Sequence, residues 1–189
     1  MSDIKRALVT GASGFIGTVL CRTLAEHDKQ VVGLMRHPVV GPWAECVCVD
    51  LCCEPLPIEA LKGVDTVFHL AGKAHAIKEG HANTHEYHRA NTQATQVVLD
   101  AAVTAGVKRF VYFSSIKAMG DDPLNCQDET SQLAPASPYG RSKRAAEDLV
   151  LEAGRERAIQ VSVLRLPVVY GPAVKGNLAA MIKAIANNR

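Results

Sequence analysis

The sequence lacks an excess of charge of either sign. Its 21 Lys and Arg residues stand against 19 Asp and Glu residues, a formal net charge of +2 over 189 residues. Proteins that bind nucleic acids or membrane surfaces usually carry a clear basic excess, so we expect neither partner. The sequence also lacks an apolar run near the ~18 residues of a membrane helix, and residues 1–6 lead into a strand pattern rather than a signal peptide. We therefore expect a cytoplasmic protein.

Cysteine and histidine spacings of a metal site are also missing. The six cysteines do not form a matching pair of Cys-x-x-Cys motifs, so we expect no metal ion and no disulfide. Cys46 and Cys48 alternate with valines, which predicts small, reduced core residues of a buried strand. His81, His85 and His88 share one face if the segment is helical. A solvated helix start explains these histidines better than a zinc site does.

Short β-branched runs alternate with helical patterns along the chain. The expected strands are 7–10, 30–35, 46–49, 65–70, 108–114 and 160–166. The expected helices are 15–27, 84–105, 139–153 and, as an amphipathic helix, about 178–185. This alternation predicts an α/β fold of the Rossmann type, a doubly wound parallel sheet with helices on both faces.

A glycine-rich segment joins the first expected strand to the first helix. Residues 10–17 read TGASGFIG, a G-x-x-G-x-x-G spacing. In such a turn Gly11 permits the tight bend, Gly14 lets a pyrophosphate approach the backbone, and Gly17 allows close helix–strand packing. The position of the motif at the start of a βα series predicts that it binds a dinucleotide. The expected contacts are Gly11, Ser13, Gly14, Phe15, Ile16 and Gly17.

The end of the strand expected over 30–35 lacks the carboxylate that reads a ribose 2′-hydroxyl. Met35 and Arg36 stand there instead. Arg36 is suited to pair with a 2′-phosphate, which favours NADP over NAD, although an exposed loop arginine explains the residue equally well. Asp50, at the end of the next strand, is a candidate for the adenine edge or a polar strand terminus.

A tyrosine and a lysine four residues apart begin the helix expected over 139–153. Tyr139 and Lys143 therefore share one helical face. The pKa of tyrosine is ordinarily about 10, and a nearby ammonium group favours the phenolate and so makes tyrosine a usable acid/base. Ser114 and Ser115 end a strand at the carboxyl edge of the sheet, where ligands bind in open α/β folds. A serine hydroxyl there can hydrogen-bond the substrate oxygen with which Tyr139 exchanges a proton.

Together these motifs resemble the extended short-chain dehydrogenase/reductase family, the NAD-dependent epimerase/dehydratase group. The matching stretches, in the order of the family, are 10–17, 50–51, 69–72, Asn91, 113–115, 139–143 and 166–172. The resemblance implies that Ser115 is the catalytic serine, Tyr139 the acid/base and Lys143 its partner. Hydride then passes between a substrate carbon and a nicotinamide ring while Tyr139 moves the proton.

The resemblance also implies further contacts. Besides Arg36, Asp50 and the catalytic pair, the expected cofactor contacts are Leu51, Leu70, Ala71, Gly72, Asn91, Pro167 and Val169. The expected substrate contacts are Lys73, Ser114 and Asn177. Asn177 is also explained as a helix N-cap.

The branch of the family remains open between several activities. Sugar 4,6-dehydratases of this family usually carry Asp-Glu directly after the catalytic hydroxyl, where this sequence has Ile116 and Lys117. Residues 114–120 instead resemble nucleotide-sugar 4-epimerases and 4-keto-sugar reductases. Dihydroflavonol- and hydroxysteroid-type reductases share the same core, and a non-catalytic NAD(P)-sensing regulator is a further alternative.

The expected partner is a nucleotide-diphosphate sugar, most often UDP-linked in this family. The resemblance also implies a homodimer through the helices 84–105 and 139–153. We expect residues 1–175 to form the NAD(P)-binding domain and residues 176–189 to begin a C-terminal substrate-binding portion that is mostly missing. A fragment of this kind should keep cofactor binding while sugar turnover is weak or absent.

Overall fold

The computed structural model describes residues 4–73, 84–120, 126–130, 133–172 and 177–187. Its parallel strands form one six-stranded sheet of order β3-β2-β1-β4-β5-β6. The strands are β1 (Arg6–Thr10), β2 (Gln30–Met35), β3 (Glu45–Cys48), β4 (Thr66–His69), β5 (Arg109–Ser115) and β6 (Gln160–Leu166). Each predicted strand is therefore confirmed, with bounds that differ by a residue or so, and so is the Rossmann-type sheet.

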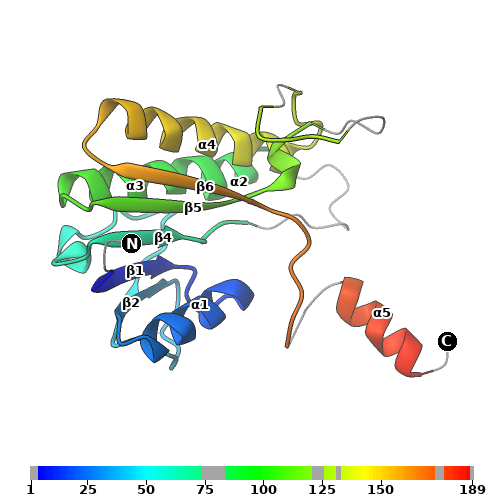
Figure 1. Ribbon diagram of the computed structural model, residues 1–189, viewed down its shortest axis with the longest axis horizontal. Helices are drawn as coiled ribbons and strands as arrows, with labels where there is room; N and C mark the ends of the chain where they lie inside the picture. The colour runs from blue at the N-terminus through cyan, green and yellow to red at the C-terminus, as the bar shows by residue number, and fades with distance from the viewer. Residues whose placement is uncertain (1–3, 74–83, 121–125, 131–132, 173–176, 188–189) are drawn as a thin grey trace.

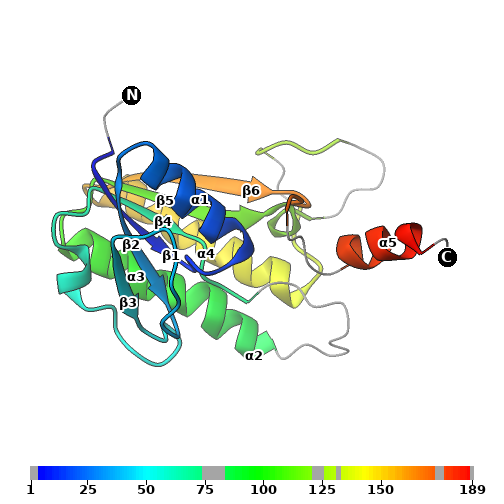
Figure 2. The same ribbon diagram turned by 90° about the horizontal axis from the view of Figure 1, so that it is seen from below.

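Helices cover both faces of this sheet (Figures 1 and 2). Helix α1 (Phe15–Glu26) lies on one face, and α3 (Ala94–Thr104) and α4 (Pro138–Glu156) lie on the other. The remaining helical segments are α2 (Thr84–Tyr87), η2 (His88–Gln93), α5 (Asn177–Ala186) and the short 3₁₀ turns η1 (Ile58–Leu61) and η3 (Ile116–Ala118). Helix α5 lies apart from the sheet, beyond the carboxyl end of β6.

The strand order reverses between β1 and β4, which pair directly from Ala7 and Thr66 to Thr10 and His69. In open α/β sheets the carboxyl ends of strands at such a reversal form the ligand-binding crevice. The glycine-rich loop leaves β1 at this edge, and β5 ends beside it with Ser115. The topology therefore brings together the motifs that the sequence holds far apart.

Two apolar clusters hold the layers together, one on each face of the sheet. The larger packs α3 and α4 on the strands and includes the fully buried Leu8, Val67 and Phe110. The smaller packs α1 on β1 and β2 through residues such as Cys21 and Val31. Central strands that are covered on both faces explain the nearly continuous apolar runs of the sequence.

The helix predicted over 84–105 is interrupted by a different geometry. Residues 88–93 form a π-helix between α2 and α3. Single π turns inside α-helices often mark functional positions, and Asn91 lies in this one. The helix ends as predicted at Gly106, which has a positive φ of 70° and follows the last helical turn.

The prediction of buried cysteines on β3 is wrong. Cys46 and Cys48 are exposed and free, with their Sγ atoms 3.9 Å apart. The reason is that β3 is an edge strand with only one covered face, to which Val47 turns. Residue alternation gave the correct period but the opposite face.

Of the three spaced histidines, His81 lies outside the described residues, and His85 and His88 are exposed. Within the described ranges, the structure has no group of three or more His, Cys, Asp or Glu side chains suited to hold a metal ion. No helix in the described part of the chain is long and apolar enough to cross a membrane.

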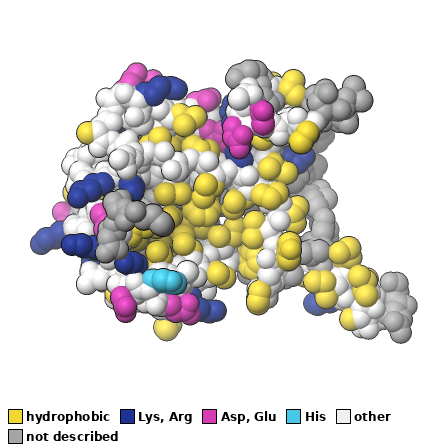
Figure 3. Space-filling model, in the orientation of Figure 1, with side chains coloured by type: hydrophobic (Ala, Val, Ile, Leu, Met, Phe, Trp, Pro, Cys, Tyr) yellow, Lys and Arg dark blue, Asp and Glu magenta, His cyan; other side chains and the backbone are white. Residues whose placement is uncertain are grey.

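Exposed apolar side chains gather near β6 and along α5. They are Leu164, Val168, Val169, Tyr170, Met181, Ile182 and Ile185. Figure 3 shows hydrophobic side chains collected in the middle of the face seen in Figure 1 and again on α5. The apolar period that predicted the last helix is thus present as a helix with an uncovered face.

Candidate nucleotide-binding and catalytic site

The glycine-rich loop is a tight turn with little room for side chains. Gly11 has a φ of 68°, and its N–H donates to the Leu34 carbonyl at 2.9 Å. A Cβ on Gly11 would lie 3.0 Å from the Ala71 nitrogen, and one on Gly17 would lie 2.2 Å from the Gly11 oxygen. Gly14 caps α1 without a side-chain hydrogen bond, which leaves the helix N-terminus open to an anion.

A buried hydrogen-bonded chain fixes the neighbouring β4 loop against β1. Thr10 Oγ1 accepts the backbone N–H groups of Leu70 and Ala71 at 3.1 and 3.0 Å, and it lies 2.7 Å from His69 Nδ1. Because this oxygen already accepts two N–H groups, its own proton goes to Nδ1. His69 then carries its proton on Nε2 and donates to Thr95 Oγ1 at 2.9 Å. Burial, and then the charge of Lys143, lower the His69 pKa to about 3, so the ring stays neutral.

Two cavities meet at the glycine-rich loop. The first, of ≈ 330 Å³, is lined by Gly11, Gly14, Phe15, Ile16, Gly17, Leu70, Gly72, Lys73, Asn91, Phe113, Ser114, Ser115, Tyr139, Lys143, Leu166, Pro167 and Val169. The second, of ≈ 480 Å³, is lined by Gly11, Ser13, Gly14, Leu34, Met35, Arg36, Val49, Asp50, Leu51, Cys52, Leu70, Ala71, Gly72, Lys73, Glu86, Arg89, Ala90 and Ala94. Every predicted site residue whose side chain the structure describes lines one cavity or both.

The three candidate catalytic residues meet in the first cavity. Ser115 ends β5, and its Oγ accepts the N–H of Lys117 at 3.2 Å. Tyr139 lies in the first turn of α4, which Ser137 caps by accepting the Gly140 N–H at 3.0 Å. Lys143 lies one turn further along the same helix, with a side chain that is almost fully buried.

The electrostatics of this pair differ from the sequence-based expectation. The Lys143 Nζ donates to the Phe113 carbonyl at 2.6 Å and lies 4.3 Å from the centre of the Tyr112 ring. Burial lowers the Lys143 pKa to about 7, partly offset by Glu147. Burial also raises the Tyr139 pKa, while its hydrogen bond with Ser115 lowers it. In the chain without a cofactor, burial is thus the largest influence on the Tyr139 pKa and places it above its ordinary value.

Asn91 ties the π-helical segment to the start of α4. Its Oδ1 accepts the Lys73 N–H at 2.7 Å, and its Nδ2 donates to Ser142 Oγ at 2.9 Å. Ser142 Oγ in turn donates to the Tyr139 carbonyl at 2.7 Å. The side-chain amide is thus used to hold Tyr139 and the Lys73 loop at a fixed separation.

The remaining predicted residues lie around the rims of the cavities. Arg36 is exposed at the second cavity, and Asp50 accepts the Cys52 N–H at 3.0 Å beside it. Lys73 is paired with Glu86 at 2.6 Å. Asn177 begins α5 as predicted, and its side chain lies outside the described part of the structure.

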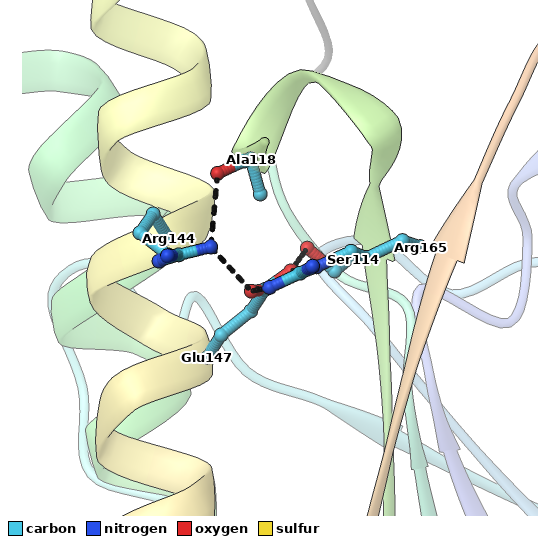
Figure 4. Close-up of polar contacts among 5 residues, drawn as sticks. All are labelled: Ser114, Ala118, Arg144, Glu147 and Arg165. Carbon is cyan, nitrogen blue, oxygen red and sulfur yellow. Dashed lines mark hydrogen bonds and ion pairs between the residues drawn. The ribbon is translucent and has the colours of Figure 1, made fainter. Parts of the chain in front are cut away.

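Ser114, a predicted substrate contact, has its hydroxyl turned to a buried carboxylate. Its Oγ donates to Glu147 Oε1 at 2.5 Å (Figure 4). Sequence reasoning missed Glu147, Thr10 and Ser142 as contributors to this site. The signal for Glu147 was its position four residues after Lys143, a charged residue on the buried face of an amphipathic helix.

The chain matches the NAD dependent epimerase/dehydratase family over residues 7–189. It is 33% identical over 190 residues to the UDP-glucose 4-epimerase of Vibrio cholerae, covering 96% of this chain and 57% of that protein. It is 31% identical over 184 residues to the dTDP-glucose 4,6-dehydratase of Streptomyces niveus, covering 88% of this chain and 54% of that protein.

Among solved structures, the chain is similar to MoeE5 in complex with UDP-glucuronic acid and NAD. The TM-score is 0.85 at 35% identity, and the match covers 95% of this chain and 60% of that one. The chain thus spans less than two thirds of the length of these relatives. Since the match includes the glycine-rich loop, the sheet and the Tyr139–Lys143 helix, the chain belongs to the NAD dependent epimerase/dehydratase family.

Proposed function

We propose that the protein is an NAD(P)-dependent nucleotide-sugar epimerase that transfers hydride at a sugar carbon, with Tyr139 as the acid/base. The observation that carries this proposal is the shared cavity: Ser115, Tyr139 and Lys143 line it together with the glycine-rich loop. A 4-keto-sugar reductase is the second candidate, because Arg36 at the rim of the second cavity suits an exchangeable NADP.

The residues present fit a dinucleotide. The cradle at Gly11, Gly14 and Gly17 has no space for side chains, and the open N-terminus of α1 suits a pyrophosphate. The second cavity, lined by Leu34, Asp50 and Leu51 among others, suits the adenosine end. A bound nicotinamide supplies the hydride acceptor and donor.

The chemistry of this chain's own residues is proton transfer and orientation. Because burial raises the Tyr139 pKa, the phenol holds its proton at neutral pH and is ready to give it to a sugar ketone. In the oxidation direction the phenol must first lose its proton, and the phenolate oxygen then accepts the proton of the sugar hydroxyl. Ser115 is hydrogen-bonded to Tyr139 and is the donor for the oxyanion that develops on the sugar. The Lys143 ammonium, held by the Phe113 carbonyl, faces the same cavity.

The proposed substrate is a UDP-sugar. The Vibrio cholerae relative is a UDP-glucose 4-epimerase, and MoeE5 was solved with UDP-glucuronic acid. A dehydratase is disfavoured, although dehydratases are among the relatives, because Ile116 and Lys117 carry no carboxylate for the elimination step. Ser114 and Lys73 line the cavity and are the proposed substrate contacts.

The choice between NAD and NADP rests on Arg36. The solved structure of MoeE5 holds NAD, which favours NAD for this chain as well. The preference for NADP from Arg36 stays a prediction, and comparison of the two affinities decides it. Three further proposals are a cytoplasmic location, a homodimer through α2–α3 and α4, and a substrate-binding portion beginning at residue 176.

A single-turnover assay tests the function. The protein is incubated with NAD and then with UDP-glucose or UDP-glucuronic acid, and the near-ultraviolet absorbance of reduced nicotinamide is followed. We expect slow, weak reduction with at least one UDP-sugar, because the chain holds only the start of the proposed substrate-binding portion, and loss of this reduction in Tyr139→Phe. Tyr170→Phe is the matched control, because Tyr170 is 77% exposed and lines neither cavity. Reduction by a flavonoid or steroid alcohol alone, or equal rates in Tyr139→Phe and the wild type, would overturn the proposal.

A further inference from the structure

The middle of α4 contains a fully buried carboxylate, Glu147, whose exposed fraction is 0%. Arg165 on β6 binds it with two nitrogens, Nη2 at 2.7 Å and Nε at 3.1 Å. Ser114 on β5 donates to its other oxygen, and Arg144 lies 4.0 Å away (Figure 4). One side chain therefore joins the catalytic helix to the two strands beside it.

A buried ion pair is a costly way to join a helix to a sheet. Desolvation of both charges commonly cancels their attraction, and apolar residues of the same volume often serve stability better. The neighbouring contacts of α4 with the sheet are indeed apolar, through Ala146 and Val150. A charge at this position therefore indicates a role in addition to holding the helix in place.

Lys143 lies one helical turn before Glu147, on the same face of α4. Its ammonium is buried against a carbonyl and the face of the Tyr112 ring, on β5. The titratable groups around it are Tyr112 from β5, His69 from β4, which is neutral, and Tyr139 and Glu147 from α4. Arg165 from β6 and Arg144 from α4 partly offset the charge of Glu147. Glu147 is a buried carboxylate one turn from Lys143 on the same face of α4, and its charge opposes the lowering of the Lys143 pKa by burial.

We propose that Glu147 is a positioning residue for the catalytic pair: its buried carboxylate favours the charged form of Lys143 and holds α4 in register with Ser114 and Ser115 on β5. The inference rests on the proposed function for the task of Lys143. The charge of Lys143, however, is measurable without cofactor or substrate. Arg165 sets the strength of the effect, because its two hydrogen bonds neutralise part of the carboxylate.

Titration of Lys143 by NMR tests the proposal. The full chain is labelled with ¹³C in its lysine side chains, and the Lys143 Cε signal is assigned by its loss in Lys143→Arg. The chemical shift of this signal is followed against pH, which gives the titration midpoint of Lys143. Glu147→Gln should lower the midpoint by about one pH unit, the usual effect of one nearby charge. Asp148→Asn, an exposed carboxylate at the next position, should leave it unchanged.

A second variant should shift the Lys143 midpoint in the opposite direction. Arg165→Met removes the cation and leaves Glu147 with Ser114 and Arg144, so the Lys143 midpoint should rise. General loosening of α4 does not produce opposite shifts in the two variants. Thermal midpoints are recorded for all variants, so that loss of stability is separated from loss of charge.

An unchanged Lys143 midpoint in Glu147→Gln, with only a lower thermal midpoint, would show that Glu147 is merely structural. If Glu147→Gln does not fold, a midpoint that fails to rise in Arg165→Met overturns the proposal by itself. If the predicted shifts occur but NAD and UDP-sugars do not bind, the proposed function is wrong while the effect of Glu147 on Lys143 stands.

Discussion

Gly17→Ala is the substitution whose effect follows most directly from the geometry. A methyl group there would lie 2.2 Å from the Gly11 oxygen and 3.0 Å from both the Cα and the oxygen of Ala12. All three are backbone atoms, so no side-chain rotation relieves the clash. Helix α1 must withdraw from the loop by about 1 Å, because packed interiors leave no spare volume.

We expect this overpacking to lower the free energy of unfolding by about 1–3 kcal/mol. In a chain of this length each kcal/mol corresponds to about 2–4 °C in Tm. NAD affinity should fall roughly tenfold or more, since a loss of about 1.4 kcal/mol is already tenfold and the displaced helix N-terminus faces the pyrophosphate. Urea unfolding measures the first effect, and calorimetric titration measures the second.

Gly171→Ala is the matched control, because its added methyl would approach only Phe15 Cζ, at 3.8 Å. Its unfolding midpoint should equal that of the wild type. Should Gly17→Ala bind NAD with wild-type affinity and unfold at the wild-type urea concentration, the close contact between α1 and the loop would be refuted.

Three more predictions concern the same region. His69 takes up a proton near pH 6.5 in the unfolded chain but only near pH 3 in the folded one, so the folded state should lose stability as the pH falls from 6.5 to 3. The loss should be smaller in His69→Asn, and urea unfolding midpoints recorded against pH measure both. Thr10→Val leaves two N–H groups without their acceptor and should lower the free energy of unfolding by about 1–3 kcal/mol. Thr104 is exposed, so Thr104→Val should leave the free energy of unfolding almost unchanged in the same assay. If the Arg36 guanidinium binds a 2′-phosphate, Arg36→Ala should lower the affinity for NADP about tenfold and leave the affinity for NAD unchanged. Equal losses of affinity for both cofactors would exclude this role of Arg36.

The sheet was predictable because its signals are local. β-branched runs bounded by glycine and polar residues gave every strand, and the glycine spacing of residues 10–17 located the turn after β1. The topology then followed from general rules for parallel sheets, which bring the carboxyl ends of β1, β4 and β5 to one edge.

Features that depend on partners distant in sequence were not predictable. The exposure of Cys46 and Cys48 depends on β3 being the edge strand, which no local pattern states. The rise of the Tyr139 pKa depends on how deeply the side chain is buried, which the sequence spacing does not state. The tie between Glu147 and Arg165 joins α4 to the strand that follows it, across 18 residues of sequence.

Calorimetric titration of the chain with NAD tests the central claim most directly, because every proposed role depends on a dinucleotide in the cavity beside Tyr139. We expect one saturable site per chain, with binding retained in Tyr139→Phe and weakened in Gly17→Ala. The absence of saturable binding by NAD and NADP alike, with the chain folded, would contradict it.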